Sequence, residues 1–326
     1  MLNTLSSDEH RESVLKFQQT SDITEHAAGM TGWNVRYDQV SPGQFAGSIT
    51  ELSLNGMQLV RDKANQAMVK NGASPEGSVM FNLPLTSTAD NVYCDGHSFN
   101  LQSLLVSRGE CLPEIKTPSN IDVICISAQL DMLQQSLQKQ NIKLNLTATT
   151  HLYQLQQLNN QVELVNLLGS VLNPDSNQSL LELPAIQRGI RDSVLQHLLE
   201  LIDEEQVHYL EPLARKRVVD RARDYMMSHI NEPPTIVELC NNVGASRRKL
   251  QYCFQETLGT NPVAYLRTLR LNAVHRELLT PYRTESVHDI AVERGFLHLS
   301  RFANDYKQLF GELPSETLRR TQSQLC

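Results

Sequence analysis

The sequence predicts an α+β protein, with an antiparallel β-barrel followed by helices and then an all-helical C-terminal region. Two observations lead to this prediction. Short apolar segments separated by Gly, Pro, Asn and Ser recur up to about residue 126, which is typical of antiparallel strands. After that point the apolar residues repeat every three or four positions, which indicates amphipathic helices.

Five segments carry the strand pattern, and they place a sandwich or barrel at about residues 30–127: "FAGSITELSL", "MQLVRD", "GSVMFNLPL", "LLVSRG" and "IDVICISA". The longest of these apolar runs is far shorter than the roughly 20 residues of a membrane-spanning helix. The polar N-terminus "MLNTLSSDEHRESV" has the pattern of neither a signal peptide nor a transit sequence. The six cysteines show no CxxC pair and no metal-ligand spacing, so we expect reduced thiols and a cytoplasmic protein.

Helices are expected over about residues 128–205. The segment "SAQLDMLQQSLQKQ" predicts a helix with Ser127 as its N-cap, and "TTHLYQLQQLNNQVELVNLLGSVL" predicts a second. A third helix carries one apolar stripe, formed by Ile186, Ile190, Val194 and Leu198. This stripe either covers the barrel or forms the seam of a dimer, because apolar positions four residues apart create a face that another element buries.

The C-terminal region contains one small helical device twice. In the first copy Thr235 caps a short helix, Gly244 turns the chain, and Ser246 caps a second helix that ends at Gly259. The copies align at an offset of 51 up to the turn glycine and of 52 beyond it, pairing Gly244 with Gly295, Leu250 with Phe302, Phe254 with Tyr306 and Pro262 with Pro314. The apolar positions and the turn and helix-ending residues repeat, while the outward positions differ. We therefore expect one scaffold that presents two different surfaces.

Between the copies lies "VAYLRTLRLNAVHRELL", a predicted helix of about 17 residues and roughly 25 Å. A rigid spacer of this length suits two helices that enter successive major grooves on one face of a duplex, roughly 34 Å apart. The charge distribution agrees with a nucleic-acid reader. Residues 213–326 hold 17 basic and 12 acidic residues, which leaves 12 basic and 24 acidic residues in the remainder.

The tandem pattern resembles the DNA-binding domain of the AraC/XylS family of bacterial transcription regulators. Its residues are most similar to those of the XylS-like branch. The segment "DIAVERGFLHLSRFANDYKQLFGELPSETLR" carries the resemblance, through Gly295-Phe296, Phe302, Tyr306-Lys307 and Pro314. It covers about 100 residues. Cys240 stands where the family usually has Ala, and Thr317-Leu318 replaces the usual tyrosine. We interpret both departures as variation within the core.

The resemblance implies which outward side chains face DNA. The base-facing candidates are Arg247, Arg248, Gln251 and Tyr252 in the first copy and His298, Ser300, Arg301 and Asn304 in the second. The candidates for phosphate contacts are Ser246, Lys249, Arg217, Arg221, Arg267, Arg270 and Lys307. Because Arg pairs well with guanine and Gln with adenine, and because the second copy has fewer basic groups, we expect the first copy to discriminate bases more strongly.

For the N-terminal region the resemblance implies a cupin-like barrel used for effector binding, dimerisation or both. Candidates for a ligand pocket are Trp33, Phe45, Met57 and Phe81, whose alternative role is ordinary barrel core. The histidines His26, His97 and His151 stand isolated, so no metal site and no cofactor are predicted.

These observations together predict a non-enzymatic regulator, since no nucleophile elbow, phosphate loop or metal-protease motif is present in the sequence. We expect residues 1–205 to sense an effector and to dimerise, residues 206–212 to form a linker, and residues 213–326 to bind DNA through helix-turn-helix motifs at 235–258 and 286–310. The expected partners are promoter DNA, a second copy of the chain and a small molecule, with RNA polymerase implied by the family resemblance. The alternative is control by a protein partner or by expression level, with no small-molecule effector.

Overall fold

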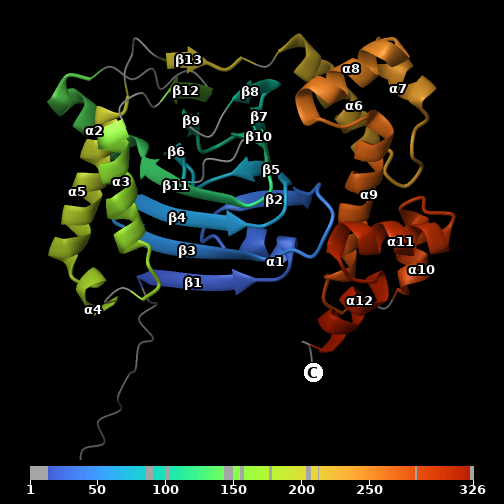
Figure 1. The fold of residues 1–326 in the computed structure, drawn as a ribbon, viewed down its shortest axis with the longest axis horizontal. Coiled ribbons are helices and arrows are strands. Elements are labelled where there is room, and N and C mark those ends of the chain that lie inside the picture. The colour runs from blue at the N-terminus through green and yellow to red at the C-terminus, as the bar shows by residue number, and fades with distance from the viewer. Residues whose placement is uncertain are drawn as a thin grey trace, which may run out of the picture.

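The computed structural model describes residues 14–85, 91–99, 103–142, 150–154, 158–175, 178–202, 207–211, 213–282 and 285–323. Two antiparallel sheets and several helices form the N-terminal region, and helices alone form the C-terminal region (Figure 1).

An eight-stranded antiparallel sheet dominates the N-terminal region. Its strands, in spatial order, are β1 (Leu15–Thr20), β3 (Gly47–Leu54), β4 (Met57–Ala64), β11 (Ile121–Gln129), β6 (Ser78–Pro84), β9 (Ser103–Arg108), β12 (Thr150–Gln154) and β13 (Val207–Tyr209). Leu59 lies in the core on one face of this sheet and Val60 in the core on the other. Both faces are therefore covered, which explains the near-continuous apolar run in β11.

A five-stranded antiparallel sheet packs against the larger one. Its order is β2 (Asn34–Gln39), β5 (Met68–Ala73), β10 (Leu112–Thr117), β7 (Val92–Cys94) and β8 (His97–Phe99). The expected barrel is not closed, because each sheet ends in edge strands: β1 and β13 in the first, β2 and β8 in the second. β13 also lies within the expected linker at 206–212, where it pairs with β12.

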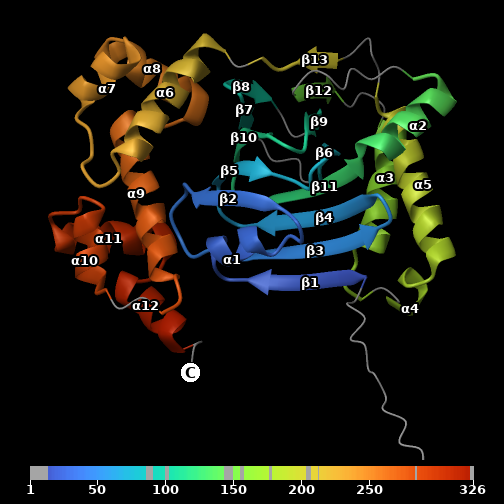
Figure 2. The same ribbon diagram turned by 180° about the vertical axis from the view of Figure 1, so that it is seen from behind.

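In the described part of the N-terminal region, the sheets are accompanied by helices α1 (Ile23–Ala28), α2 (Leu130–Gln140), α3 (Leu158–Val171), α4 (Gln178–Leu181) and α5 (Pro184–Glu200). Viewed from behind, α2, α3 and α5 lie at the end of the sheets opposite to the C-terminal helices (Figure 2). Two local predictions were wrong. Ser127 lies inside β11, and the N-cap of α2 is Gln129 without a side-chain cap. The segment 150–154, expected to be helical, is β12, because it completes the hydrogen-bonded ladder beside β9.

Seven helices form the C-terminal region: α6 (Ala214–Ser228), α7 (Ile236–Val243), α8 (Arg247–Leu258), α9 (Pro262–Leu278), α10 (Val287–Glu293), α11 (Leu299–Phe310) and α12 (Pro314–Ser323). They enclose two separate cores. α9 joins them, because Leu266 and Leu269 belong to the core beneath α7 and α8, whereas Leu271 and Val274 belong to the core beneath α10 and α11. Figures 1 and 2 both place α7, α10 and α11 on the side of α9 away from the sheets.

Within the described part of the chain, no helix is long and apolar enough to cross a membrane. The same residues contain no cluster of three or more His, Cys, Asp or Glu side chains with the geometry to hold a metal ion.

Candidate nucleic-acid interface

The first helix pair, α7 and α8, is defined by local capping. Thr235 and Glu238 form a capping box at the start of α7, and Gly244 ends that helix at a positive φ of 65°. The Ser246 side chain then accepts a hydrogen bond from the backbone N–H of Lys249 and starts α8. Because Leu250 and Phe254 are fully buried, the opposite face of α8 is turned to solvent. That face exposes every base-facing candidate of the first copy: Arg247, Arg248, Gln251 and Tyr252.

The second helix pair, α10 and α11, has the same scaffold with weaker capping at the second helix. Ser286 and Asp289 form a capping box on α10, but His298 at the N-cap of α11 makes no side-chain cap hydrogen bond. Phe302 and Tyr306 are buried, as expected for scaffold positions. The outward face exposes all four candidates of the second copy, which are His298, Ser300, Arg301 and Asn304.

The candidates for phosphate contacts divide into two groups. Five are exposed: Arg217, Arg221, Ser246, Lys249 and Lys307. Arg267 and Arg270 instead bind within the protein, Arg267 to Asp305 and Arg270 to the Arg294 carbonyl oxygen at 2.6 Å. The Arg270 guanidinium also stacks over Phe296, 4.1 Å from the ring centroid, and burial lowers its pKa to about 10. Arg270 is therefore a structural group in this conformation.

Polar contacts that the sequence analysis did not identify attach the N-terminal region to the C-terminal helices. Asn272 of α9 donates to the Gln39 carbonyl at 3.0 Å and accepts from the Gln39 backbone N–H at 2.9 Å. Arg276, one turn along α9, forms an ion pair with Asp38. The sequence of α9 gives no clear signal of these contacts, because polar residues such as Arg267, Thr268 and Arg270 are spread along the helix.

A second set of contacts holds α6 and the end of α8. Glu114 of β10 forms ion pairs with Lys216 at 3.3 Å and with Arg223, both on α6. The Lys116 ammonium donates to the Leu258 carbonyl oxygen at the end of α8 at 2.5 Å. Acidic groups of the N-terminal region thus form ion pairs with basic groups of the C-terminal region. The charge asymmetry of the sequence therefore also helps to hold the two regions together.

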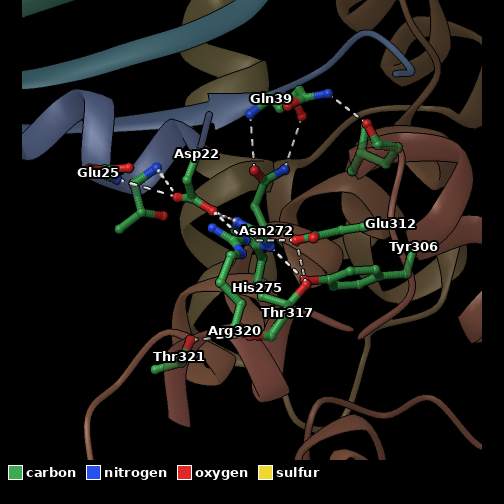
Figure 3. Close-up of polar contacts among 12 residues, drawn as sticks. Asp22, Glu25, Gln39, Asn272, His275, Tyr306, Glu312, Thr317, Arg320 and Thr321 are labelled. Atoms are coloured by element: carbon green, nitrogen blue, oxygen red, sulfur yellow. Dashed lines mark hydrogen bonds and ion pairs between the residues drawn. The ribbon is translucent and has the colours of Figure 1, made fainter. Parts of the chain in front are cut away.

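Asp22 is the centre of the largest polar cluster between the regions (Figure 3). Its carboxylate lies 2.8 Å from His275 Nε2 and 3.3 Å from an Arg320 nitrogen. His275 Nδ1 lies 2.6 Å from the Tyr306 hydroxyl, which also contacts Thr317. Burial raises the pKa of Asp22, but His275 and the backbone N–H donors of α1 outweigh it and lower the pKa to about 2. The carboxylate is therefore ionised at neutral pH.

The N-terminal region contains a cavity of about 80 Å³ between the two sheets. Its lining is mainly apolar and includes Trp33, Phe99 and Leu112, while Asp62 and Lys70 form a charged pair at 2.6 Å in its wall. The hydroxyl of Ser107, also in the lining, has no hydrogen-bond partner among the described residues. A pocket with apolar walls and a few polar groups is suited to a small ligand.

Of the four pocket candidates, the structure brings only Trp33 to this cavity. Met57 and Phe81 lie in the core between the large sheet and its helices. Phe45 packs edge-on against the His26 ring, with 5.1 Å between the ring centroids, and borders a second space at the contact between the two regions. Met57, Phe81 and Phe45 are therefore ordinary core residues, which was the alternative to lining a ligand pocket.

The apolar stripe of α5 is divided between core and surface. Val194 and Leu198 are fully buried in the core of the N-terminal region. These two residues therefore cover the sheet, which was the alternative to a dimer seam. Ile190 is partly buried, and Ile186 retains 41% exposure.

Comparison with known proteins identifies the C-terminal helices. A helix-turn-helix domain family matches residues 239–320. The "Probable thc operon regulatory protein" of Rhodococcus erythropolis is 36% identical over 148 residues, which cover 44% of this chain and 45% of that protein. The "XylDLEGF operon transcriptional activator" of Pseudomonas putida is 29% identical over 175 residues, 53% of either protein.

Among solved structures, a probable AraC family transcriptional regulator from Rhodopseudomonas palustris CGA009 is 34% identical. It matches 32% of this chain and 98% of its own, with a TM-score of 0.31. The chain spans about half the length of the curated relatives described above. These relatives are named as regulators of transcription, not as enzymes.

Proposed function

We propose that this chain, whose C-terminal region is a helix-turn-helix domain of the AraC/XylS type, is a sequence-specific DNA-binding regulator of transcription. One observation carries the proposal. All eight base-facing candidates on α8 and α11 are exposed, while the aromatic scaffold residues beneath them are buried. Exposed Arg, Gln and Asn side chains on a helix that fits the major groove are what direct base readout requires.

The spacer helix supports reading by both helix pairs at once. α9 has 17 residues, so it is about 25 Å long, and it contributes to the core of each pair. A rigid spacer of this length suits two recognition helices that enter successive major grooves. The exposed Arg217, Arg221, Lys249 and Lys307 then lie available for phosphate oxygens, which position a protein on DNA without reading its sequence.

A binding selection on the full chain tests this function. Random duplex DNA enriched by the wild-type protein should converge on a site with two parts separated by about one helical turn. On that site Arg248→Ala should lose about 5- to 150-fold in affinity and relax specificity at one base position. Arg188→Ala, an exposed arginine on α5, is the matched control and should bind as wild type. A selection that yields no sequence preference would reject the proposal.

We further propose that the protein acts as a homodimer. Four exposed apolar side chains accompany α3, α4 and α5, away from the C-terminal helices: Val162, Leu180, Leu183 and Ile186, with exposures of 52%, 51%, 49% and 41%. Exposed apolar groups concentrated on one side favour association with a second copy. Ile186→Glu should therefore shift the mass measured by light scattering toward the monomer, whereas Gln196→Glu on the same helix should not.

A small molecule bound in the cavity between the sheets is proposed to regulate the protein. The lining favours a ligand with an apolar body and one polar group, since Asp62 and Lys70 are the charged groups there. Trp33 is the only tryptophan of the sequence and lines the cavity, so its fluorescence reports binding directly. Screening metabolites by thermal shift and Trp33 emission tests the idea. A complete absence of hits, together with capture of a specific protein partner, would support the alternative of control without a small molecule.

The proposed DNA target also implies a cellular location and a protein partner. Promoter DNA lies in the bacterial nucleoid, so we propose a cytoplasmic, nucleoid-associated protein that contacts RNA polymerase at its promoters. In vitro transcription from a selected site, with and without the protein, tests this step and shows whether transcription rises or falls.

A further inference from the structure

The short helix α1 (Ile23–Ala28) has a buried polar residue at each of two positions one turn apart. Asp22 caps the helix at its start, and His26 lies four residues later. The His26 backbone N–H donates to the Asp22 carbonyl at 2.9 Å, so the two residues belong to one rigid turn. Both side chains are almost completely removed from solvent, with exposures of 3% and 0%.

His26 contacts Asp62, a residue of the cavity wall. Its Nε2 lies 2.9 Å from Asp62 Oδ1, and its Nδ1 lies 2.7 Å from the Thr20 hydroxyl. The other Asp62 oxygen accepts from Lys70 at 2.6 Å and from the Tyr37 hydroxyl at 3.2 Å. Asp62, Lys70 and Tyr37 all line the cavity. Any group that binds there and competes for Asp62 or Lys70 must alter the hydrogen bonds of His26.

Asp22 faces the C-terminal helices. One oxygen accepts from the Thr24 and Glu25 backbone N–H groups at 2.8 and 3.3 Å, which fixes the carboxylate to the start of α1. The other oxygen binds His275 of α9 and Arg320 of α12 (Figure 3). His275 in turn contacts the Tyr306 hydroxyl of α11 at 2.6 Å and stacks on Phe310, with ring centroids 4.2 Å apart.

These contacts form two polar clusters, Lys70–Asp62–His26 at the cavity wall and Asp22–His275–Tyr306 at the core of the second helix pair, which the backbone hydrogen bond from His26 to Asp22 joins within α1. Buried polar groups are costly to leave unpaired, so a change at one link is relieved by movement of the next. Glu114 and Lys116, which contact α6 and the end of α8, make no hydrogen bond or ion pair with α1 within the described residues.

We propose that α1 couples the cavity to the second helix pair, with His26 sensing the Asp62–Lys70 pair and Asp22 positioning α11 through His275. This inference rests on the proposed function, because it gives that function its route of regulation. His275 and Asp22 are positioning residues that act on the DNA-facing helix through Tyr306. The second helix pair, rather than the first, is the half whose placement responds to the cavity.

Hydrogen exchange of the full-length protein, followed by mass spectrometry, tests the coupling without DNA or ligand. Asp62→Asn retains the shape and an acceptor for His26 but removes the charge. It should accelerate amide exchange in α11 about 3- to 30-fold, the range expected for coupled sites. Asp122→Asn is the control, because Asp122 forms an ion pair with Arg61 at 2.8 Å in the same sheet, is partly buried and lies outside the chain of contacts. Its effect should remain close to its own strand and leave α11 unchanged.

A reciprocal measurement covers the possibility that Asp62→Asn disturbs folding. His275→Gln lies in the C-terminal region, and it should change the acrylamide quenching of Trp33 in the N-terminal region. The double variant should accelerate exchange in α11 by less than the product of the two single effects, because both interrupt one chain. Equal effects of Asp62→Asn and Asp122→Asn on α11, or fully independent effects in the double variant, would overturn the proposal. Since neither readout uses DNA, these outcomes are separate from a failure to find a DNA site.

Discussion

The two helix pairs of the C-terminal region have one scaffold and two different attachments. α8 presents the consecutive basic residues Arg247, Arg248 and Lys249, whereas α11 presents His298 and the single arginine Arg301 among its candidates. The end of α8 in the first pair accepts a hydrogen bond from Lys116, and the neighbouring α6 forms ion pairs with Glu114, whereas the second pair is attached through the buried cluster around His275. This contrast agrees with the two proposals made above, that the first pair discriminates bases more strongly and that the second pair receives the signal from the cavity.

The buried tyrosines of the two cores show the same contrast. The Tyr306 hydroxyl contacts both His275 and Thr317, whereas the Tyr265 hydroxyl has no hydrogen-bond partner within the described residues. Burial raises the pKa of both tyrosines, so both remain protonated at neutral pH. Thr317 is fully buried and completes the polar cluster of the second core.

The largest expected effect tests whether the scaffolds are equivalent. Phe302→Ala and Leu250→Ala occupy corresponding positions and are both buried, so each should destabilise the protein by about 2–5 kcal/mol through cavity formation. Urea unfolding followed by circular dichroism measures this. Val263→Ala, at an exposed position of α9, should change stability by less than about 0.5 kcal/mol. A large loss in one core only would show that the two scaffolds do not contribute equally.

Acid should weaken the attachment of the second pair. The pKa of Asp22 falls from 3.8 to about 2 on folding, so its contribution, of the order of 2 kcal/mol, is fully present above the unfolded pKa and lost as pH falls toward 2. The stability difference between wild type and Asp22→Asn should therefore shrink between pH 5 and pH 2. Asparagine retains the N-cap of α1, so the comparison isolates the charge. A difference independent of pH would contradict the role of the ionised carboxylate.

Removing single hydroxyls distinguishes the two cores. Tyr306→Phe leaves His275 and Thr317 without a shared partner, so it should cost about 1–3 kcal/mol. Tyr265→Phe removes an unpaired hydroxyl and should stay within about 0.5 kcal/mol of wild type. Thermal unfolding of the two variants in parallel gives the comparison, and equal losses would show that the polar cluster contributes nothing specific.

The smallest expected effect concerns the helix caps. Ser246 caps α8, and the corresponding residue of α11 is His298, whose side chain makes no cap hydrogen bond. Ser246→Ala should cost about 1 kcal/mol, and His298→Ser should stabilise α11 by a similar or smaller amount. Exchange rates in the first turn of each helix measure both changes. If His298→Ser also weakens binding to a selected site, the histidine has been retained for DNA contact at the expense of the cap.

Local chemistry explains which elements could be predicted. The sequence placed α7 and α8 correctly, because Thr235, Gly244 and Ser246 act within a few residues of their own position. The same reasoning assigned a helix to β12, because a short segment such as "HLYQ" has no decisive periodicity, and its pairing with β9 decides its conformation. The open sheets and the position of Trp33 in the cavity also depend on long-range pairing.

The sequence by itself determined the duplicated helical device, its capping residues and the outward basic face of α8, since each follows from spacing and local hydrogen bonds. Only the tertiary structure decided how that device is attached. Asp22 and His275 are 253 positions apart, and nothing in the neighbourhood of either residue specifies the other. Packing brings them together, and burial then requires each polar group to find the partner that the fold supplies.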